Sequence, residues 1–157
     1  MGLLQTLFLL AALSLVQGQD SVEVGELPTL AHSVSGVFYV DNTVTFRIEN
    51  FTYDGQGPDA FIYYYPPGIS PEITGGGIDI PFNTTMRTFP LGRRFNRETV
   101  IFPLPPGVKM CDIGNITIWC RYANQFFTII EIPPSIFTTN RTLAYDCLLY
   151  TSPSPRD

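Results

Sequence analysis

The chain has 157 residues, 45% of them hydrophobic, with 9 lysines and arginines, 14 aspartates and glutamates, and a formal net charge of −5 at pH 7. This length and composition suit one domain that can bury a core of its own. The acidic balance gives no electrostatic footprint for nucleic acid, so we expect no nucleic-acid partner.

An uncharged apolar segment, MGLLQTLFLLAALSLVQG, occupies residues 1–18. Its apolar centre is too short to span a bilayer and it ends in small residues, which is typical of a secretory signal peptide. The usual basic start is missing, but cleavage before Gln19 fits the pattern, and a membrane anchor is the alternative. We therefore predict a secreted, extracellular protein with no transmembrane segment in this chain.

Four Asn-x-Ser/Thr sequons support the same compartment. The sequon asparagines are Asn50, Asn83, Asn115 and Asn140. An N-linked glycan must lie at the protein surface, so we expect Asn115 to point outward from the strand that it begins. The sequence therefore predicts a glycoprotein.

Short alternating segments separated by turn-forming residues predict an all-β fold. The segment VTFRIE places Val44, Phe46 and Ile48 on one face and follows VFYV after a tight turn, so residues 37–49 are expected to form a hairpin. Further strands are expected in AFIYYY, GIDI, TVIFPL, NITIWCRY and QFFTIIEI, and no segment sustains a helical repeat. The pattern predicts an antiparallel β-sandwich or a jelly-roll-like barrel.

The stretch YDGQGPD, residues 53–59, interrupts two aromatic runs. Its two glycines permit positive φ, its proline fixes φ, and its two aspartates can cap backbone amides, so we predict a rigid corner between strands. The alternative is a calcium site that uses Asp54 and Asp59, although two acids are few for such a site.

The sequence allows several roles for Cys120. Alternation in NITIWCRY places it with Ile116 and Ile118 on the apolar face, whereas Trp119 lies on the other face. Cys120 is then either a small buried hydrophobe or a redox thiol or metal ligand. A third interpretation is a Cys111–Cys120 disulfide, which suits an oxidising compartment but requires the chain to fold back between them. Pairing with a cysteine further along the chain is also open.

Motifs of conventional enzymes are not found in the sequence. The only histidine, His32, would have to serve any catalytic dyad, and no nucleophile motif accompanies it. Zinc spacings, a P-loop and a dinucleotide fingerprint are likewise missing. We predict no metal site, and we lean against an enzyme.

Four stretches carry a resemblance to a known family: HSVSGVFYV, IENFTYDGQGPDAFIYYY, LGRRFNRETVIFPLPPG and DIGNITIWCRY. Their order and spacing resemble the DM13 (DM-thirteen) domain, a small extracellular all-β module found beside DOMON domains, over about residues 31–133. The most specific matching residues are Tyr53, Asp54, Gly55, Gly57, Pro58, Asp59, Trp119 and Cys120. The resemblance implies a DOMON-like β-sandwich and redox or electron-transfer activity at Cys120, with haem as candidate cofactor and His32 as a candidate second ligand. Cys111 departs from the family pattern.

The last eleven residues, CLLYTSPSPRD from Cys147 to Asp157, resemble the in-frame translation of a transposase adapter used in sequencing libraries. The alternative is a native, flexible Ser/Pro-rich tail. We predict that the natural sequence diverges after about Asp146. The predicted organisation is a domain at residues 27–134, a linker at 135–146 and a missing C-terminal part.

Two functions from different classes follow from the sequence. In the first, the chain is an extracellular module of a larger protein that contacts another protein or a glycan, or that supports matrix assembly. In the second, it is a redox domain that uses Cys120.

Overall fold

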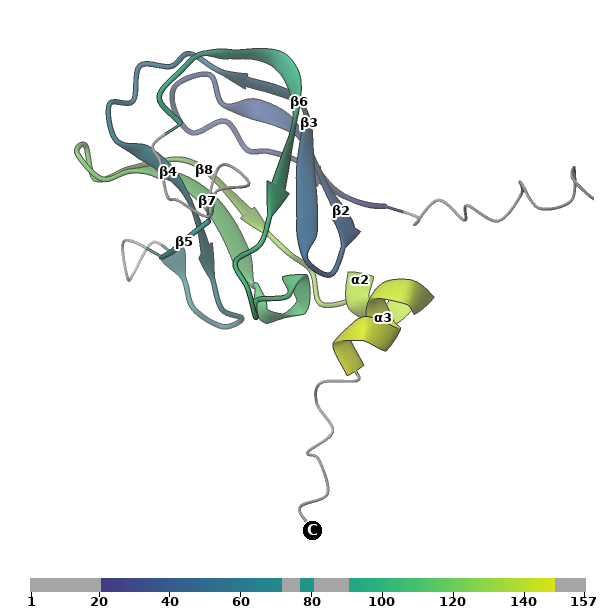
Figure 1. Cartoon of the computed structure of the whole chain (residues 1–157). Coiled ribbons are helices and arrows are strands. Elements are labelled where there is room, and N and C mark those ends of the chain that lie inside the picture. The colour runs from purple at the N-terminus through teal and green to yellow at the C-terminus, as the bar shows by residue number, and fades with distance from the viewer. Residues whose placement is uncertain (1–20, 72–76, 81–90, 149–157) are drawn as a thin grey trace, which may run out of the picture.

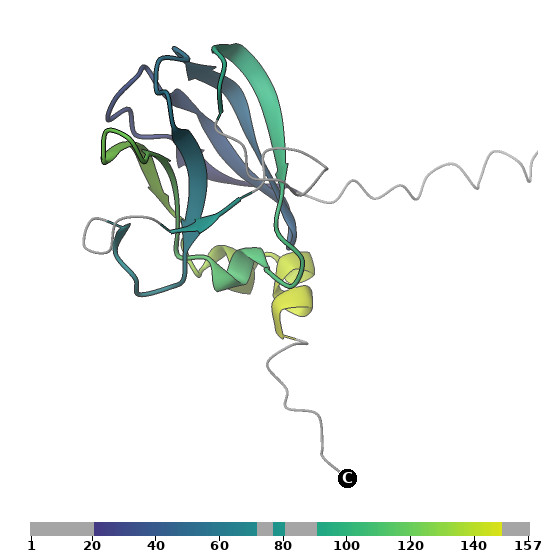
Figure 2. The same ribbon diagram turned by 60° about the vertical axis from the view of Figure 1, so that its left-hand side comes forward.

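The computed structural model describes residues 21–71, 77–80 and 91–148. They form two four-stranded antiparallel sheets, with strand orders β1-β2-β3-β6 and β5-β4-β7-β8. Figures 1 and 2 show the two sheets as layers of a sandwich. The all-β prediction is confirmed, and the separate sheets decide for a sandwich over a barrel. The strands are β1 (Val22–Glu26), β2 (Ser35–Asn42), β3 (Thr45–Tyr53), β4 (Ala60–Tyr65), β5 (Ile78–Asp79), β6 (Phe95–Pro103), β7 (Asn115–Cys120) and β8 (Gln125–Glu131).

The predicted hairpin at residues 37–49 is present as β2 and β3, which pair Val40 with Phe46. Val44, however, is not part of the apolar face, because it lies in the turn and is 48% exposed. Its backbone N–H donates to the side chain of Asn42 at 2.9 Å, which closes the turn, so β3 begins at Thr45.

Two strands differ from the sequence prediction. Strand β6 begins at Phe95 rather than Thr99, because Phe95 is buried while the polar residues after it face outward. Strand β1 was not predicted, since its apolar alternation is interrupted at Gly25. The pairing of β1 with β2 shifts register between Glu23 and Gly25, as a β-bulge does.

The core between the sheets is largely aromatic. Phe46 of β3 stacks on Phe38 of β2 and on Phe102 of β6, with ring centroids 4.8 and 4.9 Å apart. Ile118 of β7 and Phe127 of β8 belong to the same buried cluster from the opposite sheet. The burial of these rings is the main stabilising contribution of the sandwich.

The segment predicted as a linker, residues 135–146, is instead helical. It forms α2 (Ile136–Thr139) and α3 (Arg141–Leu148), which lie together at one end of the sandwich (Figures 1 and 2). Ile136, Phe137 and Leu143 join the buried core, so the linker prediction is wrong. No helix within the three described ranges is long and apolar enough to cross a membrane.

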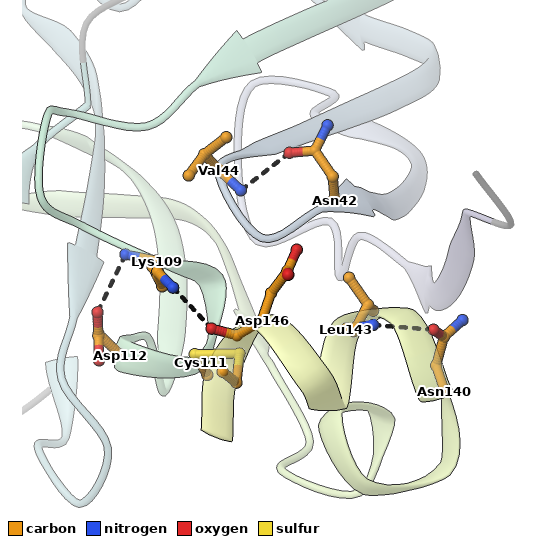
Figure 3. Close-up of a disulfide and its surroundings, with 9 residues drawn as sticks. Asn42, Val44, Lys109, Cys111, Asp112, Asn140, Leu143 and Asp146 are labelled. Atoms are coloured by element: carbon orange, nitrogen blue, oxygen red, sulfur yellow. Dashed lines mark hydrogen bonds between the residues drawn. A yellow bond between two sulfur atoms is a disulfide. The ribbon is translucent and has the colours of Figure 1, made fainter. Parts of the chain in front are cut away.

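A disulfide fastens α3 to the sandwich (Figure 3). It joins Cys111, in the short 3-10 helix η1 (Met110–Asp112), to Cys147, with the Cα atoms 6.3 Å apart. Beside it, the ammonium of Lys109 donates to the carbonyl oxygen of Asp146 at 2.7 Å. The alternative of a Cys111–Cys120 bond is therefore wrong, because β7 carries Cys120 away from η1 and leaves it as a buried free thiol. Divergence of the natural sequence after about Asp146 stays a prediction.

Candidate functional site

Cys120 lies where the segments of the sequence motif meet. It ends β7, opposite Ala60 of β4 and Gln125 of β8, and its side chain is 0% exposed. The YDGQGPD stretch passes directly from β3 to β4 at this end of the sandwich. The predicted apolar face is confirmed, since Ile116 and Ile118 are buried in the same core cluster.

The corner at residues 53–59 is held by a ring of hydrogen bonds between a side chain and the backbone. The hydroxyl of Tyr53 accepts from the N–H of Gly57 at 2.8 Å and donates to its carbonyl oxygen at 3.1 Å. A Cβ on Gly57 would lie 2.6 Å from that hydroxyl and 2.6 Å from the ring of Phe127. Gly55 has φ +77° and packs against the backbone of Arg94. Gly55 thus needs its positive φ, whereas Gly57, contrary to our expectation, is required for space.

Asp54 is occupied by contacts within the protein. Its carboxylate pairs with Nδ1 of His32 at 3.1 Å and accepts from the backbone N–H of Gln56 at 2.9 Å. The His32 ring packs on Phe127, with centroids 4.2 Å apart. Asp59 contributes its backbone carbonyl, which accepts from the N–H of Arg121 at 2.9 Å. Among the described residues no group of three His, Cys, Asp or Glu side chains converges, and the calcium alternative stays a prediction that nothing here tests.

A haem does not fit at Cys120 as these residues are packed. Tyr53, Ala60 and Phe127 belong to the same core cluster and, like Cys120, are each 0% exposed. An axial cysteine needs an open apolar slot for the macrocycle on its sulfur side, and this packing leaves none. The packing around Cys120 therefore does not support a haem ligand at this position.

The opposite face of the β4–β7 sheet carries a second group of side chains, which we call the outer-face cluster: Phe61, Tyr63, Asp79, Trp119 and Arg121. The guanidinium of Arg121 lies 3.8 Å above the Phe61 ring centroid and donates two hydrogen bonds to the Asp79 carboxylate, at 2.7 and 2.8 Å. Nε of Arg121 also donates to the hydroxyl of Tyr63. The rings of Tyr63 and Trp119 meet edge to face, with centroids 5.6 Å apart.

This environment changes the acidity of Tyr63. The pKa of Tyr63 is raised to about 12, mainly by burial; the hydrogen bond and charge of Arg121 oppose the rise, while Asp79 adds to it. Tyr63 is therefore a neutral phenol at ordinary pH, and its proton lies beside a carboxylate.

Comparison with known proteins places the chain in a family. A family model described as "Electron transfer DM13" matches residues 26–132. The chain belongs to the DM13 family. It is 31% identical over 114 residues to Protein Skeletor, isoforms B/C and isoforms D/E, of Drosophila melanogaster; the match covers 73% of this chain but 14% and 7% of those relatives. No solved structure matches.

The DM13 motif is divided between two sites by the fold. Tyr53, Asp54 and Gly57 build the corner at the end of the sandwich that holds Cys120. Trp119 precedes Cys120 in β7 but points to the other face, where it is half-buried against Tyr63. Side chains alternate across a strand, so adjacent motif residues serve different environments.

Most residues of the outer-face cluster were not predicted as a site from the sequence of this DM13 domain. All six residues of β4 are buried, and a continuous apolar run predicts a strand without showing which residues share a face with partners elsewhere. Asp79 and Arg121 join Tyr63 only through the pairing of β5 and β7 with β4.

The sequon asparagines occupy different settings in the DM13 domain. Asn50 is exposed and has φ 52°, and Asn115 begins β7, half-buried, with its amide nitrogen 3.4 Å from the carbonyl oxygen of Ile69. Asn140 precedes α3 and accepts from the N–H of Leu143 at 3.1 Å. Asn83 lies outside the described residues.

Proposed function

We propose that this chain is the electron-transfer module of a larger secreted protein, with Cys120 as its candidate redox residue. The description of the DM13 family supports electron transfer. The chain spans 14% or less of the curated relatives that it matches, which supports a module of a larger protein. The apolar segment at residues 1–18 and the sequons support secretion.

The burial of Cys120 is the observation that defines the kind of redox chemistry. Thiol–disulfide exchange requires a thiolate to attack a sulfur atom directly, and a side chain with 0% exposure offers no approach. A single electron, in contrast, can pass through a short thickness of packed protein. Burial therefore favours one-electron transfer at Cys120 over disulfide exchange or a haem reaction. In that step the acceptor takes one electron from Cys120, the thiol proton passes to solvent, and a neutral thiyl radical remains in the core.

A second candidate function rests on the same burial. Cys120 lies in the same buried cluster as Ile118, Phe127 and Tyr53, where a free cysteine can also serve as a small hydrophobic side chain that fills the core. In that case the domain is an extracellular interaction module whose partner is a protein or a glycan. The corner at residues 53–59 then has only a structural role, which is to connect β3 to β4 rigidly.

One substitution separates the two functions. The purified, secreted chain is mixed with ferricyanide, a one-electron acceptor, and its reduction is followed against that by Cys120→Ser. Met110→Leu is the matched control, because Met110 is another fully buried sulfur-containing side chain of the core. Loss of acceptor reduction in Cys120→Ser alone supports the redox module, whereas equal reduction by all three proteins supports the interaction module. No Soret band is expected in any of them.

Secretion and glycosylation are tested in the same preparation. Expression in animal cells should remove the first eighteen or so residues and add N-glycans, with Asn50 the most accessible of the described sequons. Peptide-N-glycosidase should then increase gel mobility, and Thr52→Ala, which destroys the Asn50 sequon, should remove one glycan. An intracellular chain with unchanged mobility would contradict the proposed compartment.

A further inference from the structure

The outer-face cluster places the only tryptophan of the chain against a buried tyrosine. The ring centroids of Trp119 and Tyr63 are 5.6 Å apart and their planes are inclined at 69°. Tyr63 is 2% exposed, whereas Trp119 is half-buried and reaches solvent. Indole and phenol are the aromatic side chains that lose a single electron most readily, so the pair joins a surface donor to an interior one.

Oxidation of a tyrosine also requires a proton acceptor, because the tyrosyl radical is neutral. Asp79 lies directly opposite Tyr63 in the β4–β5 pairing. Arg121 fixes both groups, since it donates to the phenol oxygen and to both carboxylate oxygens of Asp79. Phe61 supports the guanidinium from below at 3.8 Å. A phenol held neutral by burial thus has a carboxylate and a fixed cation around its oxygen.

We propose that Trp119 and Tyr63 form a one-electron relay in which Asp79 accepts the phenol proton. The relay deepens the proposed electron-transfer function and rests on it, but it does not use Cys120, which faces the core from the same strand. The entry point is Trp119, because it is the partner of the pair that reaches solvent.

The electrons and protons of the relay balance as follows. A one-electron oxidant of high potential, either a radical or an oxidised metal centre of a partner, takes one electron from the indole of Trp119, and the indole proton passes to solvent. The Trp119 radical then takes one electron from Tyr63 and regains a proton from solvent. The phenol proton moves to Asp79, so that the net change is one electron lost, a tyrosyl radical formed and one carboxylate protonated.

Pulse radiolysis of the full chain tests the relay. The azide radical is the probe, because it oxidises tryptophan by one electron. We expect the absorption of the tryptophanyl radical to decay while that of the tyrosyl radical grows. Tyr63→Phe should abolish this coupled growth, and Asp79→Asn should slow it. Tyr64→Phe is the matched control, because Tyr64 is the next residue of β4 but belongs to the core on the other face; it should leave the transfer unchanged.

Two results would overturn the relay: a tyrosyl signal that grows equally in Tyr63→Phe, or a tryptophanyl radical in the unmodified chain that decays without any tyrosyl growth. Retained Trp119 fluorescence and circular dichroism in Tyr63→Phe show that the variant is folded. The relay should persist in Cys120→Ser, so a failure of the relay and a failure of the Cys120 assignment are separate results.

Discussion

Replacing Gly57 with alanine should destabilise the domain more than its small size suggests. The new Cβ would lie 2.6 Å from the Tyr53 hydroxyl and 2.6 Å from the Phe127 ring, whereas unstrained van der Waals contacts have a separation of about 3.5 Å or more. Both side chains are 0% exposed, so neither can swing into solvent. Overpacking of this kind costs about 1–3 kcal/mol. Each of the two Tyr53–Gly57 hydrogen bonds adds about 1 kcal/mol when it is disrupted, so we expect the free energy of unfolding to fall by about 3–5 kcal/mol.

Gly107→Ala provides the control for this experiment. Gly107 has φ +82°, and a Cβ added there would have nothing within 4 Å, so alanine meets only the left-handed backbone penalty of about 1–2 kcal/mol. The free energy of unfolding is measured by urea titration with Trp119 fluorescence. The double variant Gly57→Ala with Tyr53→Phe should lose less free energy of unfolding than the sum of the losses of the two single variants, because the clashing hydroxyl is gone. If Gly57→Ala costs no more than Gly107→Ala, the packing argument is refuted.

Three further predictions concern the cysteines, the C-terminal sequence and Tyr63. Peptide mapping of the non-reduced chain should show Cys111 linked to Cys147, and Cys120 should react with an alkylating reagent only after unfolding. Cys111→Ser should lower the free energy of unfolding by up to about 4 kcal/mol, the loop-closure value for this sequence separation. A linked Cys111–Cys120 peptide would contradict the structure. An adapter-free transcript that diverges after about Asp146 would show which natural residue takes the place of Cys147, and recovery of the same eleven residues before a stop codon would sink the adapter interpretation. The pKa of Tyr63 is raised to about 12 from 10.0, so the stability that its neutral phenol contributes is complete below about pH 10 and is lost as the pH rises towards 12. Urea titrations across this range should show a smaller alkaline loss for Tyr63→Phe, and an identical loss in both proteins would argue against the raised pKa.

The sequence by itself determined the antiparallel all-β class, the hairpin of β2 and β3 and the apolar setting of Cys120, whereas the choice of a sandwich over a barrel came from the two separate sheets. These features depend on side-chain alternation and on turn-forming residues. Both are set by residues that are close in sequence, whatever the strand packs against in the folded protein. The strand at Ala60–Tyr65 is equally local, because six consecutive apolar residues between turn formers have few other structures available.

The tertiary structure decided which distant residues meet. The sequence left a Cys111–Cys120 disulfide open as one interpretation among several, but the path of the chain through α3 brings Cys147 to Cys111 instead. The need for glycine at position 57 arises from the Tyr53 hydroxyl and from Phe127, a residue of β8 far along the chain, and not from the φ of Gly57 itself. Tyr63 acquires its partners from β5 and from the end of β7, since only the register of three strands places a carboxylate and a guanidinium around one phenol oxygen. Such encounters depend on the whole packing of the sandwich, and no local pattern of residues specifies them.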